Sequence, residues 1–286
     1  MLHFEAILDR TIALWEKAKG GVTTMPVELA DEVGEPGLPP DQFIAAIWQE
    51  RRRYVKAGRI KQPHPWSVAV GTGKVSRKAL VEYLKNRYYF LVNINRKDAQ
   101  IIANCPIPDA RRMLLRKYID EEGQDVAGGK LGAHYEMWLK VSDALGVPRE
   151  IMNSFSDVLP VYRFTVDAVF DFAKNRSWLE GVAATYATEG GMWRRYTPRE
   201  EHREEGLLRE GEALKKYYGL PEDALEFYHV HSAANDDHGE INETILRKYC
   251  TTKELQRGAL EAARFRWENQ ETRHDIIYRY LVVGES

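Results

Sequence analysis

Two histidines, His231 and His238, lie seven positions apart within a stretch of helical periodicity. Asn235 falls between them, at steps of four and three residues. Side chains at those steps share one face of a helix, so these three could coordinate an ion together. A mixed set of imidazole and oxygen donors suits iron or manganese, whereas a structural zinc site usually recruits thiolates. The alternative interpretation is a polar, solvent-exposed helix face.

Further metal ligands would have to come from other helices. Glu121 and Glu122 stand in the last turn of a predicted helix, where acids oppose the helix dipole and invite another explanation. His134 begins the next predicted helix. Glu189 has small and apolar neighbours that indicate burial, and a buried carboxylate needs a partner or a metal. Helical bundles build di-iron centres from such inward-facing carboxylates and histidines.

The elements that must position these side chains are helices. Almost every segment of useful length has the 3.6-residue apolar period, and no convincing run of alternating strands occurs, so we predict an all-α fold. Residues 1–60 are expected to form a helical extension and residues 61–286 the main bundle domain. The charge-dense stretch 199–219 is interpreted as a solvated face. Helices are predicted over 1–20, 40–58, 76–105 (as one helix or two), 109–123, 133–146, 149–155, 159–175, 177–195, 221–250 and 252–281.

Composition narrows the classes of function. The 286 residues, 44% of them hydrophobic, can bury a sizeable core. Forty-one basic and 43 acidic residues leave a formal charge of −2, so nothing favours nucleic acid or an anionic membrane, and a small-molecule partner is expected. No run reaches transmembrane length and the first residues carry charges that a signal peptide lacks, which predicts a soluble, cytoplasmic protein. Cys105 and Cys250 have no spacing that suits a disulfide framework or a thiolate zinc site.

Several long stretches resemble the pyrroloquinoline quinone synthase branch of the haem-oxygenase-like, or TenA-like, helical superfamily. The resemblance covers most of residues 64–281. It implies a compact seven-helix bundle around one buried pocket, and a homodimer. The stretches that carry it are 64–90, 97–112, 159–173, 234–239 and 264–267.

Three positions depart from that synthase. Glu121 stands where the synthase has a histidine, Tyr196 corresponds to a second family histidine, and Arg266 corresponds to a family lysine. The loss of both histidines argues against cofactor-free quinone-forming chemistry. The pattern resembles instead the metal-binding branch of the superfamily, the haem-oxygenase-like di-iron oxidases and oxygenases.

The ligand order of that branch is Glu, His, Glu and then His-x3-Asp-x2-His. Asn235 stands where those enzymes have the aspartate, and its neighbour Asp236 is rotated by about 100° around the helix. The resemblance implies two irons per chain. A neutral amide is a poorer ligand for a hard cation, so one iron per chain is the alternative. The residues that match the other positions are Glu121 or Glu122, His134, Glu189, His231 and His238.

The resemblance implies an iron-dependent oxidase or oxygenase that uses O2 as co-substrate. Its substrate would be a small carboxylate-bearing molecule, an amino acid or a peptide-derived intermediate in cofactor or natural-product biosynthesis, and an external reductant could supply electrons. Tyr196 and Arg266 are the candidate catalytic residues. Guanidinium groups can clamp carboxylates by paired hydrogen bonds, although each arginine could equally be an interhelix or surface charge. The candidate substrate-binding residues are His64, Arg87, Arg163, Arg199 and Arg266.

Three other functions are compatible with such a bundle. A metal-free oxidase acting like the quinone synthase would remain active in a chelator. A TenA-like thiaminase would need a nucleophilic cysteine, and neither Cys105 nor Cys250 lies in a stretch that matches one. A non-catalytic small-molecule carrier or regulator would bind its ligand without consuming oxygen, and no basic DNA-reading helix supports a regulator.

Overall fold

The fold is helical throughout the described part of the chain. The only non-helical pairing among these residues is an isolated antiparallel bridge between Pro36 and Thr252. The predicted all-α class is therefore confirmed, and none of the described helices is long and apolar enough to cross a membrane. The computed structural model describes residues 2–19, 35–123, 132–189, 192–198 and 209–284. Its description excludes the side chains at 2–5, 7–8, 18–19 and 231–237.

The described elements agree closely with the periodicity of the sequence. In chain order they are α1 (Leu2–Lys19), α2 (Pro40–Lys56), α3 (Pro65–Gly71), α4 (Arg77–Asn104), α5 (Pro108–Glu121), α6 (His134–Ala144), α7 (Arg149–Ser154), α8 (Pro160–Asn175), α9 (Trp178–Tyr186), α10 (Met192–Arg195), α11 (Glu210–Tyr218), the 3-10 turn η2 (Glu222–Leu225), α12 (Glu226–Tyr249), α13 (Lys253–Tyr278) and the π-helical turn η3 (Arg279–Val283).

Capping residues fix where two central helices begin. Ser76 Oγ accepts the Ala79 N–H at 3.1 Å and caps α4. Ser177 and Glu180 form a reciprocal capping box at the start of α9, in which Glu180 accepts the Ser177 N–H at 3.0 Å. These caps set the positions along α4 and α9 of the polar groups described below.

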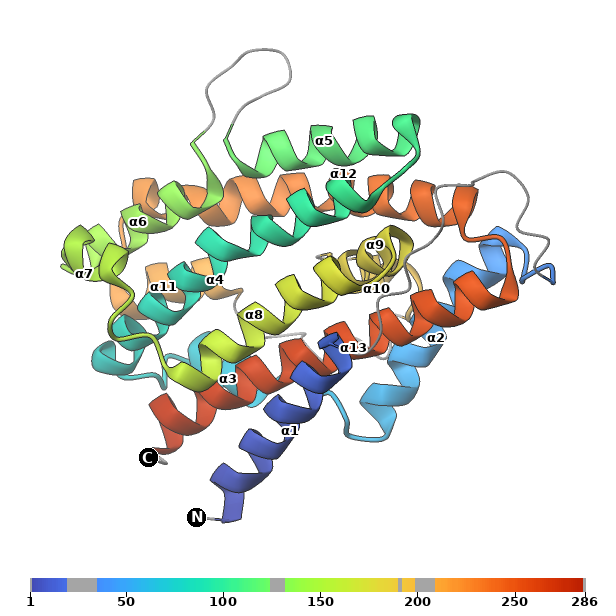
Figure 1. Cartoon of the computed structure of the whole chain (residues 1–286). Helices are drawn as coiled ribbons and strands as arrows, with labels where there is room; N and C mark the ends of the chain where they lie inside the picture. Colours follow the sequence, from blue (N-terminus) through green and yellow to red (C-terminus); the bar gives the residue numbers. More distant parts are fainter. Residues whose placement is uncertain (1, 20–34, 124–131, 190–191, 199–208, 285–286) are drawn as a thin grey trace.

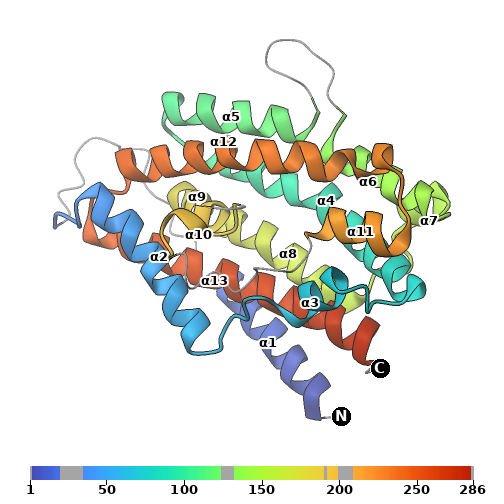
Figure 2. The ribbon, with the colours of Figure 1, turned by 180° about the vertical axis from the view of Figure 1, so that it is seen from behind.

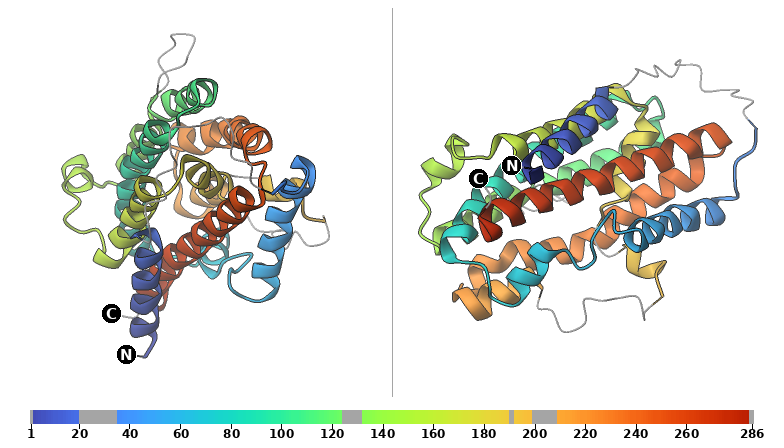
Figure 3. Two further views of the ribbon diagram at one scale, coloured as in Figure 1. Left: turned by 45° about the vertical axis from the view of Figure 1, so that its right-hand side comes forward. Right: turned by 90° about the horizontal axis from the view of Figure 1, so that it is seen from below.

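Helix α9 occupies the interior of the bundle. Figure 1 shows α4, α8 and α13 as neighbours with α5 and α12 above them, and Figure 2 shows the same order from behind. In both views α9 lies between these layers, and it packs against α13, α12 and α4. The left view of Figure 3 shows the other helices grouped around it. A segment at the end of α9 is therefore held from several sides.

A glycine sets the distance between α9 and α4. A Cβ placed on Gly181 would lie 2.6 Å from Cγ1 of Ile101, which is closer than real carbon contacts. We expect Gly181→Ala to lower the free energy of unfolding by about 1–3 kcal/mol through overpacking. The matched control is Gly258→Ala in α13, whose Cβ would meet Glu180 at an ordinary 3.4 Å. That change should be neutral or stabilise by up to about 1 kcal/mol, because alanine favours helix. Urea unfolding of both variants checks the pair, and equal effects would contradict it.

The two N-terminal helices pack onto the bundle. Helix α1 lies against α8 and α13, as the right view of Figure 3 shows for α13. Arg10 Nη1 of α1 meets Asp275 Oδ2 of α13 at 3.3 Å. From α2, Ile44, Ile47 and Trp48 are fully buried in the same apolar cluster as residues of α9, α12 and α13. Both helices thus contribute to the core that surrounds the site.

Three local features differ from the sequence expectation. The helix predicted over 177–195 is interrupted, because α9 ends at Tyr186 and α10 begins only at Met192. Glu189 lies in the bend that follows α9, next to a pair of glycines, which are weak helix formers. The charge-dense stretch includes the helix α11, which buries Ala213 and Leu214, so its described part is not solvated on all sides. The short helix α3 was not predicted.

A layer of buried polar side chains separates two apolar clusters. Along α4, Leu91 belongs to one cluster and Ile101 to the other. Along α13, Trp267 and Ile276 likewise belong to different clusters. Because both long helices run from one cluster to the other, they carry polar residues where they cross the gap. The buried polar residues in these two crossings are Asn95, Lys97, Asp98, Asn269, Glu271, Thr272, Arg273 and Asp275.

Candidate active site

Two histidines and one glutamate meet beside this polar layer. Glu121 is the last residue of α5, His134 is the first residue of α6, and His238 lies within α12. Nδ1 of His134 lies 2.5 Å from Oε2 of Glu121, and Nδ1 of His238 lies 3.1 Å from Oε1. Both imidazoles are buried, and the Glu121 side chain is 14% exposed. Three of the predicted ligands are therefore brought together by three different helices.

The charge on Glu121 is stabilised by its surroundings. Burial raises the pKa of this carboxyl, but the imidazoles of His134 and His238, followed by the nearby Lys117 ammonium, lower it well below its usual range. Glu121 is therefore a carboxylate at neutral pH. Two imidazoles and one carboxylate are the donor set of non-haem iron(II) oxygenases, so the chemistry of these residues fits iron. Each imidazole faces a different oxygen of Glu121, and the three residues are not among the described groups whose ligand atoms all lie within 4.8 Å of one another.

Glu189 meets a lysine. Lys117 Nζ donates to Glu189 Oε1 at 2.5 Å, and Asn242 Nδ2 donates to the same oxygen at 3.3 Å. Lys117 is buried, and its Nζ lies 3.9 Å from Asp98 Oδ1. Burial lowers the pKa of Lys117, but the carboxylates of Asp98 and Glu189 outweigh it and raise the pKa above its usual value. Glu189 is partly buried, with its side chain 11% exposed, and its partner is an ammonium group.

A second lysine reinforces this charged cluster. Lys97 Nζ donates to both carboxylate oxygens of Asp98 at 2.7 Å. Burial lowers the pKa of Lys97 from its usual value, partly offset by the carboxylate of Asp98. Lys97, Asp98, Lys117 and Glu189 thus form a chain of alternating charge across the polar layer, and Asp98 is the link shared by both lysines.

The remaining predicted ligands are placed as follows. Glu122 accepts a hydrogen bond from Asn95 Nδ2 at 3.1 Å, so of the two neighbouring acids it is Glu121 that meets the histidines. The backbone of His231, Asn235 and Asp236 belongs to α12, but their side chains lie outside the described part of the structure. Their role as ligands stays a prediction.

Two adjoining cavities border the cluster. One has a volume of about 250 Å³ and lies between α2, α3, α13 and the end of α9. The other, of about 210 Å³, is bordered by Glu121 and His134. Thr188, Glu189 and Gln270 line both cavities and form the partition between them. A small molecule in either cavity would lie against this partition.

Three arginines line the cavity beside Glu121. Arg87 and Arg273 lie over the Phe90 ring, at 4.7 and 3.9 Å from its centroid, and Arg266 is 3% exposed. Among the described residues, Nε of Arg266 and Nη1 of Arg273 have no hydrogen-bond partner. Burial and the neighbouring Arg273 lower the pKa of Arg266 well below its usual value, and burial lowers that of Arg273 to about 10. Buried guanidinium nitrogens without a hydrogen-bond partner favour an anion in this cavity.

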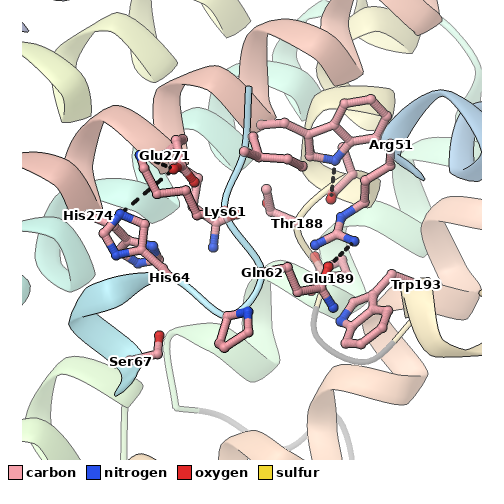
Figure 4. A pocket seen from close by; sticks show the side chains of 15 residues that line it. Arg51, Lys61, Gln62, His64, Ser67, Thr188, Glu189, Trp193, Glu271 and His274 are labelled. Carbon is pink, nitrogen blue, oxygen red and sulfur yellow. Dashed lines mark hydrogen bonds and ion pairs between the residues drawn. The ribbon is translucent and has the colours of Figure 1, made fainter. Parts of the chain in front are cut away.

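The other cavity contains a second group of potential ligands. Among the described residues, the ligand atoms of His64, Glu271 and Asp275 all lie within 4.8 Å of one another. Lys61 Nζ already occupies this group, at 2.7 Å from Glu271 Oε1 and 2.8 Å from Asp275 Oδ1. Figure 4 shows Lys61, His64 and Glu271 together on one side of the cavity, across from Glu189.

His64 is held by hydrogen bonds at both ring nitrogens. Its Nδ1 accepts the Trp66 N–H at 3.0 Å and so caps α3, which leaves Nε2 to donate to Asp275 at 3.1 Å. A neutral His64 therefore has no free lone pair for a metal ion. The His64 group is better described as an ion-pair network than as a metal site.

Asp275 makes the stability of this network depend on pH. Burial raises its pKa, but His64 and Lys61 outweigh burial and hold it well below its usual value. The stabilisation is therefore complete above the unfolded-state pKa of about 3.9 and is lost as the pH falls towards the folded-state value. We expect Asp275→Asn to cost about 2 kcal/mol at pH 7, and distinctly less at pH 3.

Urea unfolding at the two pH values measures this difference. The matched control is Asp143→Asn, which removes the exposed ion pair with Arg149 and should cost about 0–1 kcal/mol. A cost for Asp275→Asn that is the same at pH 3 and pH 7 would contradict the assignment.

Two predicted residues lie apart from both cavities. The Tyr196 hydroxyl donates to Glu243 at 2.9 Å, and its ring stacks on Trp48. Arg163 donates to the Phe155 carbonyl and lies over the Tyr89 ring. Neither Tyr196 nor Arg163 lines the two cavities. Arg199 lies outside the described residues.

Sequence reasoning missed four of the buried charged residues. Lys117 is one turn before Glu121 on α5, and Arg273 is two turns after Arg266 on α13, so helical spacing from a chosen residue would have found both. Lys97 and Asp98 are adjacent in sequence, and no spacing distinguishes them from a surface pair.

Comparison with known proteins places this arrangement in a family. The sequence profile of the TENA/THI-4/PQQC family matches residues 49–202, more than half of the chain. A pyrroloquinoline-quinone synthase from Cronobacter sakazakii is 34% identical over 148 residues, which are 52% of this chain and 55% of the relative. One from Pseudomonas aeruginosa is 40% identical over 122 residues, 43% of this chain and 47% of the relative. The chain thus spans about half the length of these curated relatives.

Solved structures agree on the fold. A domain of unknown function with a haem-oxygenase-like fold from Shewanella denitrificans aligns with a TM-score of 0.62 and 15% identity, covering 86% of this chain and 93% of that one. A TenA homologue from Pseudomonas syringae aligns with a TM-score of 0.57 and 17% identity, covering 86% of this chain and 98% of the homologue. The haem-oxygenase-like bundle expected from the sequence is confirmed.

Proposed function

Because this chain belongs to the TENA/THI-4/PQQC family, we propose that it is an O2-dependent oxidoreductase of a cofactor or natural-product pathway. Relatives that match 43–52% of the chain carry the name pyrroloquinoline-quinone synthase, which supports oxidative chemistry in biosynthesis. We further propose a homodimer that draws on an external reductant, following the resemblance of the sequence to the wider superfamily.

The single observation that carries the proposal is the meeting of Glu121, His134 and His238. These residues would hold one iron ion, through two imidazoles and a carboxylate. Iron bound there would supply O2 activation at its open coordination positions. The protein contributes a setting that is shielded from water, because both histidines are almost inaccessible to solvent.

The arginines support a substrate that carries carboxylate groups. Arg266 and Arg273 present unpartnered nitrogens inside the cavity next to Glu121, and Arg87 lies beside them. Carboxylates accept paired hydrogen bonds from guanidinium, so they would orient the substrate against the partition formed by Thr188, Glu189 and Gln270. A cavity of about 210 Å³ suits an amino acid or a small peptide-derived molecule better than a fatty acid.

Anaerobic loading with Fe(II) tests this function. The metal-free protein is mixed with Fe(II), freed of excess ion and analysed for bound iron, and O2 uptake is then recorded with an oxygen electrode. We expect specifically bound iron, and O2 uptake that the metal-free protein lacks and that a chelator added before loading prevents. A protein that retains no iron after removal of excess ion would overturn the iron-dependent function.

A metal-free oxidase is the second candidate. It is favoured by the identity of 34–40% to pyrroloquinoline-quinone synthases and by Lys117, which already neutralises Glu189. Its substrate would bind to the same arginines, and its activity would persist in a chelator. The iron measurement above therefore distinguishes the two candidates.

A further inference from the structure

The second carboxylate of the candidate centre already has a cation beside it. Lys117 Nζ lies 2.5 Å from Glu189 Oε1, and the lysine side chain is 3% exposed. Asn242 donates to the same oxygen at 3.3 Å. A metal ion on Glu189 would have to share its carboxylate with this buried ammonium group.

Helix α5 fixes the position of that ammonium group. Lys117 and Glu121 are four residues apart, so they project from the same face of the helix, one turn from each other. Lys117 Nζ also lies 3.9 Å from Asp98 Oδ1, so the carboxylates of Glu189 and Asp98 both hold it. Lys117 is thus built into the centre rather than placed at its edge.

The charge of the cavity also opposes a second metal ion. The described lining contains five basic side chains and three acidic ones, so it is net positive before any ion binds. One divalent ion at Glu121 has a carboxylate and two imidazoles to compensate it. A second would add two positive charges in a region of low dielectric, beside an ammonium group. The basic residues are Arg87, Lys97, Lys117, Arg266 and Arg273, and the acidic ones are Asp98, Glu121 and Glu189.

We propose that the centre holds a single metal ion at Glu121, His134 and His238, and that the Lys117 ammonium takes the place of a second metal ion beside Glu189. The inference rests on the proposed function, because it presupposes a metal ion at Glu121. It favours the one-iron alternative over the two irons that the resemblance implied. In this arrangement Glu189 is the counter-ion of Lys117 and not a metal ligand.

Metal counting without turnover tests the inference. Metal-free wild type and four variants are titrated anaerobically with Co(II). Binding is followed by visible absorption and by elemental analysis, and this measurement needs no substrate. We expect one ion in the wild type, in Glu189→Gln and in Lys117→Arg, which keeps the positive charge. We expect a second ion in Lys117→Met, and no specific ion in Glu121→Gln.

The outcomes separate this inference from the proposed function. Two ions in the wild type, loss of the ion in Glu189→Gln, or a single ion in folded Lys117→Met would overturn the role of Lys117 and leave a metal-dependent enzyme in place. No ion in the wild type would overturn the metal-dependent function itself. If circular dichroism shows that Lys117→Met is unfolded, Glu189→Gln decides the matter, since one bound ion excludes Glu189 as a required ligand.

Discussion

Glu121→Gln is expected to lower the affinity for Fe(II) by more than about 100-fold, because a change even in a residue that only supports a metal ligand costs 10–100-fold. The substitution keeps the shape of the side chain but removes the negative charge that both His134 and His238 face. An amide offers one oxygen in place of two equivalent ones, and its NH2 group would face one of the imidazoles. Iron-dependent O2 uptake should fall with the bound iron.

The neighbouring acid provides the control. Glu122→Gln removes the same charge one residue away, where the carboxylate accepts a hydrogen bond from Asn95 and does not meet the histidines. It should leave Fe(II) binding within about threefold of the wild type, since it touches no donor of the set. The measurement is an anaerobic competition titration of Fe(II) against a coloured chelator. Equal losses in Glu121→Gln and Glu122→Gln would show that net charge, and not ligation, determines the affinity.

Arg266→Met is expected to stabilise the ligand-free protein while it weakens binding of carboxylates. Arg266 is almost wholly buried, its Nε has no partner among the described residues, and the positive charge of Arg273 lies nearby. Replacing a buried uncompensated charge with an apolar side chain of similar length should raise the free energy of unfolding by about 1–4 kcal/mol. The loss of the Arg266 hydrogen bond to Asn269, at 3.2 Å, offsets about 1 kcal/mol of that gain.

Thermal unfolding with and without citrate measures both effects. Citrate should raise the melting temperature of the wild type, because a ligand that binds the folded state stabilises it. In Arg266→Met the ligand-free melting temperature should be higher, and the citrate shift should nearly vanish, since truncating one partner of a buried charge pair costs about 2–5 kcal/mol of binding. Sodium chloride at equal ionic strength controls for salt.

An exposed arginine provides the matched control for this variant. Arg112→Met removes a side chain that is 73% exposed and pairs with Asp109 on the surface. It should change neither the melting temperature nor the citrate shift appreciably. A lower melting temperature for ligand-free Arg266→Met would mean that Arg266 has a structural partner, and it would remove the support for an anion site.

The fold could be predicted because apolar periodicity is a local property of the sequence. The helices that carry Glu121 and His134 followed from it directly. The break after Tyr186 could not be predicted from periodicity, because small apolar residues on both sides continue the pattern of a helix. The pair of glycines at 190–191 is the signal that indicates a break.

The sequence predicted three of the residues that meet at the candidate site, but it did not predict the charged groups around them. Histidines and glutamates attract attention because they bind metals, so Glu121, His134 and His238 were found from the sequence. Lys117 was not, because a lysine on a helix is normally solvated and only the three-dimensional neighbourhood reveals its burial. The pairing of Glu189 with Lys117 joins α5 to the segment that follows α9, and no local pattern encodes it.

The polar layer between the two apolar clusters has a consequence for how this family could acquire new chemistry. The clusters supply most of the apolar burial, so they maintain the scaffold largely independently of the groups between them. Residues of the polar layer contribute mainly charge. Paired substitutions within this layer that keep its total charge should therefore leave the scaffold folded. Metal ligands, counter-ions and substrate-binding residues can then be substituted while the scaffold stays the same, so one bundle fold can host different reactions.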